Sequence, residues 1–180
     1  MTSAEYIQLK AYARIDGAWL FVLWAVAFVC YLRGLTMPLF GFPSLLLFLS
    51  TPFFVAYRLR RFRDVGREGI ISFLRGYAYA ILVFFYGGIL MAVAEYLYFA
   101  YWDHGYLMGA VQELFQSDDG IRIIKEAGLG DVVEESMSGL MSMRPIDYAL
   151  NQLSLTICAG IVLGIPIGFL MQSKKRKEQQ

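Results

Sequence analysis

Two charged residues lie inside apolar stretches of this chain, where they could do chemistry. Arg75 lies about one turn into an apolar run that begins at Ile70, and Glu95 lies near the far end of that run. A charge held in lipid is costly, so each is a functional candidate by default. Arg75 could bind an anion or a lipid headgroup. We favour the alternative, in which its long stem extends to the interface or it pairs with Asp64 or Glu68.

Glu95 could bind a proton or a cation, or it could pair with Arg144 or Arg33 at the membrane boundary. Phe85 lies near the middle of the run, and by helical rise Glu95 is about 15 Å away from it. At that distance from the centre we expect Glu95 to be partly hydrated. One acidic residue is too few for a proton relay. We therefore favour a hydrogen-bonded carboxylate at the interface.

The last apolar run opens with four polar residues, Asn151, Gln152, Ser154 and Thr156. Such side chains form hydrogen bonds between helices in membranes, each contributing about 1 kcal/mol or less. A substrate site is the second interpretation. If these groups and Glu95 lined one hydrated cavity, a transport role would follow.

The sequence offers few of the residues that catalysis or metal binding needs. The single histidine is His104, and the two cysteines, Cys30 and Cys158, lie in apolar windows and are interpreted as small buried residues without a disulfide. The sequence has no zinc-ligand spacing, phosphate loop or dinucleotide turn. We expect no catalytic residue, no cofactor and no metal. A cleft gathering Asp103, His104 and Glu95 would reopen the question of an enzyme.

The elements that must position these residues are membrane helices. The chain has 180 residues, of which 58% are hydrophobic and only 17% charged. A soluble domain carries about 25% charged residues. The charge is missing from windows long enough to span a bilayer. The predicted spans are residues 17–33, 38–57, 70–101 and 149–171.

Small residues recur at spacings of four residues on two of these runs, with an interruption at Phe84 on the third run. On the fourth run they are Gly160, Gly164 and Gly168, and on the third they are Gly76, Ala80, Gly88 and Ala92. Small side chains let two helix backbones approach closely. We expect these two faces to pack together; a homodimer seam is the alternative.

Basic residues mark one set of helix ends. Lys10 and Arg14 precede the first run, five arginines fall within residues 58–68, and Lys174, Lys175, Arg176 and Lys177 follow the fourth run. This alternation predicts four spans with both termini in the cytoplasm. It also favours a loop rather than a nucleic-acid site for the arginines.

The segment between the third and fourth runs, residues 103–148, is acidic and long. Its apolar residues recur at spacings of three and four, which predicts short amphipathic helices on the periplasmic side. Met137 and Met141 belong to a methionine-rich stripe. That stripe could bind a partner peptide, but packing against lipid or the bundle is the favoured interpretation.

Residues 57–102 resemble a family of small membrane proteins from Bacteroidota, domain of unknown function 4199. The resemblance rests on Arg63-Asp64, Gly69, Ile71-Ser72-Phe73 and an aromatic helix end before Asp103. It extends over about residues 17–177, through an acidic helical insert and a glycine-rich last span. His104-Gly105 departs from relatives that often have proline there. The resemblance implies a four-helix inner-membrane protein of a Gram-negative cell, and no functional residues can be carried over.

The predicted fold is all-α, a membrane four-helix bundle in one integral domain with short amphipathic helices between spans three and four. The leading functional hypothesis is a non-enzymatic scaffold or partner subunit in the inner membrane. The alternative is a small transporter or channel subunit that uses Glu95 and the polar start of span four. Expected partners are the lipid bilayer and another membrane protein or a second copy, but not nucleic acid.

Overall fold

The computed structural model describes residues 2–173. Its long helices are α1 (Ser3–Gly34), α2 (Pro38–Gly66), α3 (Phe73–Tyr101) and α7 (Pro145–Met171). Three short helices join α3 to α7: α4 (Tyr106–Gln116), α5 (Asp118–Glu126) and α6 (Gly130–Met141). The four long helices are apolar and long enough to cross a membrane. The predicted all-α bundle is therefore confirmed, and the chain is a multi-pass membrane protein.

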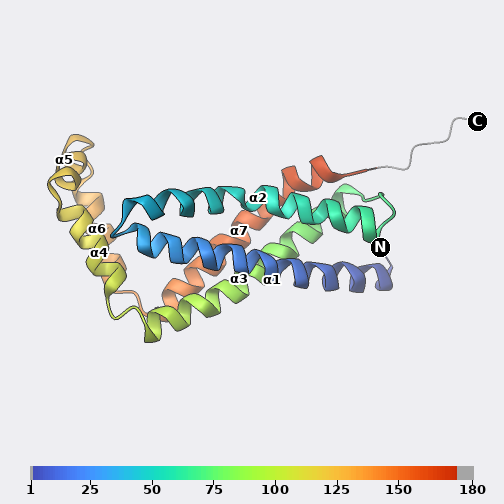
Figure 1. Cartoon of the computed structure of the whole chain (residues 1–180), viewed down its shortest axis with the longest axis horizontal. Coiled ribbons are helices and arrows are strands. Elements are labelled where there is room, and N and C mark those ends of the chain that lie inside the picture. The colour runs from blue at the N-terminus through green and yellow to red at the C-terminus, as the bar shows by residue number, and fades with distance from the viewer. Residues whose placement is uncertain (1, 174–180) are drawn as a thin grey trace, which may run out of the picture.

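The long helices run alongside one another, and the short helices lie beyond one of their ends (Figure 1). We call this end, where α4–α6 attach, the insert end, and the opposite end, where α1 starts and α7 finishes, the terminal end. α2 packs mainly on α1, α1 also packs on α3, and α3 packs along α7. Helix α3 therefore lies between α7 on one side and the α1–α2 pair on the other.

The first two long helices extend past their predicted spans at the terminal end. Helix α1 begins at Ser3 because Thr2 and Glu5 form a capping box: the Thr2 hydroxyl accepts from the Glu5 N–H at 3.3 Å, and the Thr2 N–H donates to the Glu5 carboxylate at 2.9 Å. Helix α2 continues to Gly66 and is followed by Glu68 and Gly69, whose φ values of 50° and 79° are left-handed. Arginines of the loop predicted at 58–68 thus extend α2.

The buried core lies where α1, α2 and α3 meet. Tyr79 and Phe84 of α3 are almost completely buried, and Phe62 of α2 stacks on Tyr79 with ring centroids 5.1 Å apart. Trp24 donates a hydrogen bond of 3.0 Å to the Thr51 hydroxyl inside this core. In lipid the apolar effect between helices is weak, so close packing and such hydrogen bonds hold the bundle together.

The two predicted small-residue faces meet along the α3–α7 seam. A Cβ built on Gly160 would come within 2.7 Å of the Phe84 Cβ, and one on Gly168 would come within 3.0 Å of the Tyr77 backbone nitrogen. The facing pairs are Gly76 with Gly168, Ala80 with Gly164, Phe84 with Gly160, and Gly88 with Thr156. Ala92, one turn further on, is buried. Each four-residue step on α3 thus matches a four-residue step back on α7.

Two further glycine contacts were not predicted. Gly17 of α1 lies against Gly87 of α3, where a Cβ on Gly17 would come within 3.0 Å of the Gly87 backbone nitrogen. At the insert end, a Cβ on Gly34 would come within 2.8 Å of the Gly41 backbone. These contacts bring α1 close to both of its neighbours.

At the terminal end, an isolated antiparallel β-bridge joins the segment before α3 to the segment after α7. Ile71 and Ser173 exchange two backbone hydrogen bonds of 3.2 and 2.9 Å. This ties Ser173, two residues past the end of α7, to the segment that leads into α3. The basic tail Lys174, Lys175, Arg176 and Lys177 lies outside the described residues.

Candidate functional site

A buried ionic cluster joins α1, α2 and α3. Asp16 is 2% exposed, and its Oδ1 accepts a hydrogen bond of 2.6 Å from the Arg58 Nε and another from an Arg58 terminal nitrogen. Its Oδ2 accepts from the Tyr79 hydroxyl. We call Asp16, Arg58 and Tyr79 the ionic triad. Both carboxylate oxygens are occupied, so the triad is a closed structural unit rather than a free acid.

The triad is positioned by the buried faces of the three helices. On α1, Asp16 falls in a stripe of buried residues with Leu9, Ala13, Leu20 and Trp24. On α2, Arg58 lies between buried Val55, Leu59 and Phe62, and its side chain is 16% exposed. Tyr79 has no exposed surface. Packing thus holds all three groups at one level near the terminal end.

Sequence reasoning missed the triad because Asp16 and Arg58 stand just outside the predicted apolar runs. The missing signal was periodicity. Asp16 follows Ala13 by three residues and precedes Leu20 by four, so it shares their helix face. A charged residue on an otherwise apolar face is the pattern that could have found it.

Arg75 has a partner that the sequence did not indicate. Its terminal nitrogen lies 2.5 Å from Glu5 Oε2, while Arg67 lies 2.9 Å from Glu5 Oε1. Arg75 thus pairs with Glu5 rather than with Asp64 or Glu68, and the alternative of a stem that extends to the interface stays a prediction. Asp64 pairs with arginines of its own helix, and only the helical extension of α1 back to Ser3 places Glu5 beside α3.

Glu95 lies in the half of α3 nearer the insert end and is 7% exposed. Within residues 2–173, neither Arg33 nor Arg144 forms the ion pair considered for it. Arg144 instead pairs with Asp147 at 3.0 Å, at the start of α7. The Asp147 carboxylate raises the pKa of Arg144, first through that hydrogen bond, so this helix-end pair stays ionised.

The polar start of α7 is divided between different sides of the helix. Asn151 and Ser154 are exposed, and the Ser154 hydroxyl donates back to the Leu150 carbonyl at 2.9 Å. Gln152 is half-buried, and Thr156 is buried against Gly88. The structure does not collect these four residues on one face beside Glu95.

Asp103 and His104 serve the turn between α3 and α4. The Asp103 carboxylate accepts from the N–H groups of Gly105 and Leu107, each at 3.1 Å, and so satisfies one free N–H in the first turn of α4. A ring nitrogen of His104 lies 3.0 Å from the Trp102 carbonyl. His104 and Gly105 both have positive φ, as a tight turn requires. These contacts give both residues a local structural role.

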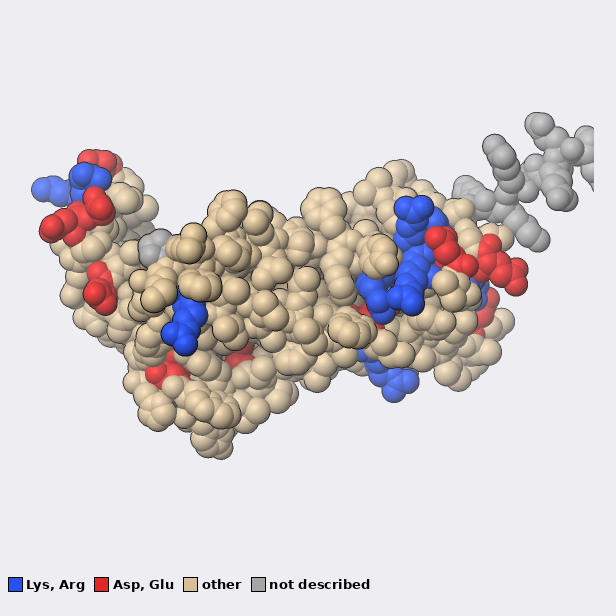
Figure 2. Space-filling model, viewed as in Figure 1, with Lys and Arg blue, Asp and Glu red and all other residues tan. Residues whose placement is uncertain are grey.

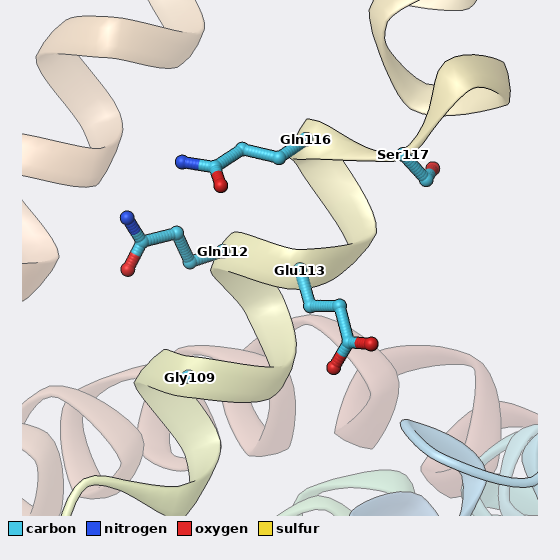
Figure 3. A pocket seen from close by; sticks show the side chains of 5 residues that line it. All are labelled: Gly109, Gln112, Glu113, Gln116 and Ser117. Atoms are coloured by element: carbon cyan, nitrogen blue, oxygen red, sulfur yellow. The ribbon is translucent and has the colours of Figure 1, made fainter.

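A surface hollow of about 590 Å³ lies along α4 (Figure 3). Gln112 and Gln116 extend to one side of the helix, and Glu113 extends to another (Figure 3). All the lining residues lie on α4 or directly after it, and their polar ends do not converge on a common point. This hollow therefore lacks the convergent groups of a ligand site.

Charge is distributed mainly toward the two ends of the molecule (Figure 2). Basic and acidic side chains gather at the terminal end and on the insert, and the surface between is mostly uncharged (Figure 2). Among the described residues, no group of three or more His, Cys, Asp or Glu side chains could hold a metal ion. Among the described residues, the ionic triad is more deeply buried than the cluster of Glu5, Arg67 and Arg75, because its carboxylate, Asp16, is 2% exposed whereas the side chain of Glu5 is 26% exposed.

Comparison with curated proteins and with solved structures finds no match. A family model described as a protein of unknown function, DUF4199, matches residues 16–173. The match covers most of the chain, from Asp16 of the ionic triad to Ser173 of the terminal bridge. This multi-pass helical membrane protein therefore belongs to the DUF4199 family.

Proposed function

We propose that this chain is a non-enzymatic protein of the inner membrane of a Bacteroidota cell, with both termini in the cytoplasm. It serves there as a scaffold or partner subunit for another membrane component. The proposal rests on the exposure of the insert, helices α4–α6. Helices α4, α5 and α6 contain no buried residue in the described chain, and they lie beyond the ends of the long helices (Figure 1).

The insert has the composition of a contact surface. Leu114, Ile123 and Val132 are each more than half exposed on it, next to acidic residues such as Asp118 and Asp119. Exposed apolar side chains rimmed by charge favour a protein partner. Ser117 accepts a hydrogen bond from the Gly120 N–H at 3.1 Å and so caps the start of α5.

Site-specific photocrosslinking in native membranes tests this role. A benzophenone amino acid placed at Ile123 should give a discrete protein adduct, either with another membrane protein or with a second copy. The matched control is Val162, which is similarly exposed but lies within the apolar part of α7. Protein adducts of equal yield at both positions, or none at Ile123, would contradict the proposal.

A small transporter or channel subunit is the second candidate; the burial of Glu95 alone favours it, since the polar residues at the start of α7 do not gather beside Glu95. A buried carboxyl in a membrane helix marks ion or proton pathways in other proteins. Purified chain in sealed vesicles should then carry a proton or cation flux, and Glu95→Gln should abolish it. Flux that is absent, or that is unchanged by the substitution, would remove this candidate.

A further inference from the structure

A cavity of about 230 Å³ lies where the insert joins the bundle. Its walls come from the end of α3, the turn into α4, the end of α6 and the start of α7. The residues that line it are Phe99, Asp103, Gly105, Leu107, Met108, Leu140, Met141, Met143, Pro145 and Tyr148. Three of them are methionines: Met108 on α4, and Met141 and Met143 at the end of α6 and in the turn after it. We propose that this cavity binds a soft monovalent cation, Cu(I) or Ag(I), through the thioether sulfurs of Met108, Met141 and Met143.

The chemistry of the lining selects this class of ion. Thioether sulfur is a soft, neutral ligand that suits Cu(I), whereas carboxylates and carbonyls suit hard ions such as Mg²⁺. The only carboxylate on the wall, Asp103, already accepts two backbone hydrogen bonds. The remaining walls are largely apolar, so hard divalent ions would lose hydration without replacement ligands.

Each methionine stands beside backbone that is fixed by a hydrogen bond. Met108 follows Leu107, whose N–H donates to Asp103 at 3.1 Å. Met141 follows Leu140, whose carbonyl accepts from the Tyr148 hydroxyl at 2.9 Å. These bonds hold the two segments against the bundle and pre-organise the side chains that follow them.

Met143 is fixed in the same way. Its N–H donates to the Leu140 carbonyl at 3.2 Å, and the next residue, Arg144, is held by Asp147 through its backbone N–H at 2.9 Å. Phe99 stacks on Tyr148 with ring centroids 4.5 Å apart and closes one wall of the cavity. Met108 of α4 and the pair Met141 and Met143 at the end of α6 therefore line one cavity from two anchored segments.

Methionine also fills gaps in apolar cores, and that role predicts burial. Met141 is 54% exposed and Met143 is 37% exposed, although both line the cavity. Thioethers at an open mouth are accessible to an ion that enters from outside the bundle. A gap-filling role also predicts that leucine replaces these residues without consequence for metal binding.

The test is a Cu(I) titration of the purified full chain in detergent, under anaerobic conditions, against a Cu(I) chelator. Cys30→Ala and Cys158→Ala form the background, because thiolates would bind Cu(I) themselves. We expect one Cu(I) per chain. The triple substitution Met108→Leu, Met141→Leu and Met143→Leu should weaken binding at least about tenfold.

Met37→Leu is the matched control, since Met37 is 56% exposed at the insert end and does not line the cavity. Its Cu(I) affinity should equal that of the background, and X-ray absorption of the bound copper should report sulfur ligands. The proposal is overturned if the background chain binds no Cu(I), if the triple variant binds equally well, or if the copper has only nitrogen and oxygen ligands. If the triple variant fails to fold, the three single leucine variants decide by the same criterion.

Discussion

Asp16 is a buried carboxylate with hydrogen-bond partners on two other helices. It carries a charge on a helix face that is otherwise apolar, and it is stabilised there by Arg58 and Tyr79. Burying an ion pair yields little net stability, but removing one partner leaves an uncompensated charge, which costs about 3–5 kcal/mol. Removing any one member of the ionic triad should therefore lose most of the stability that the three together provide.

The substitution Asp16→Asn tests this at the residue scale. We expect it to lower the unfolding free energy by about 3 kcal/mol or more, because Arg58 would remain buried without a counter-charge. Thermal unfolding in detergent measures the effect. Asp119→Asn removes half of an exposed pair with Arg122 and should change stability by less than about 1 kcal/mol.

A double substitution separates charge from packing. Asp16→Leu combined with Arg58→Met should be more stable than Asp16→Leu alone, because it removes both charges together. If the double variant were no more stable than the single one, the ion pair would not be the source of the effect.

At this scale the sequence singled out Arg75 and Glu95 as charged residues within apolar runs, but it did not indicate Glu5 as the partner of Arg75. Arg75 pairs with Glu5, which is far away in the chain, and such a contact depends on how far α1 extends. Asp16 could have been found from its helix face, whereas its pairing with Tyr79 requires knowing which helices are neighbours.

At the scale of elements, α3 and α7 pack so closely that the glycines between them leave no room for a larger side chain. Gly160→Ala places a Cβ within 2.7 Å of the Phe84 Cβ, so we expect a loss of about 1–3 kcal/mol in unfolding free energy from overpacking. Thermal unfolding of the purified variant gives the comparison.

Gly41→Ala is the control for that substitution. Gly41 is also in a long helix, but a Cβ there meets no atom within 4 Å. Alanine is a better helix former than glycine by about 1 kcal/mol, so this variant should be as stable as the parent or more so. Equal losses in the two variants would argue against a specific seam.

Helices and their small-residue faces follow from periodicity, which is why four long helices and the insert were predictable. The α1–α3 crossing at Gly17 and Gly87 was not, because an isolated glycine carries no repeat. The end of α2 was also misjudged, since arginines form helices well and need not mark a loop.

For the whole molecule, orientation is the property that the proposed function needs. Val65 and Ile123 are both largely exposed, one at the terminal end and one on the insert. In a chain without native cysteines, Ile123→Cys should react with a membrane-impermeant maleimide in spheroplasts, and Val65→Cys should react only after lysis. The reverse pattern would place the termini outside the cell.

The insert should be cut without loss of the bundle. Lys125 is exposed on α5, which has no buried residue among those described, so trypsin should cleave there early. The two fragments should stay together on gel filtration in mild detergent, because α3 and α7 fall in different fragments and remain packed. Separate elution would mean that the loop, rather than the seam, holds α7 in place.

The four-residue register between α3 and α7 has a consequence for how related sequences can diverge. Phe84 fills the space that Gly160 leaves, and Thr156 fills the space beside Gly88. Bulk on one helix is thus complemented by its absence on the other. In relatives, an enlarged residue on either helix should be accompanied by a reduced one at the facing position, so the volumes of each facing pair should vary in opposite directions.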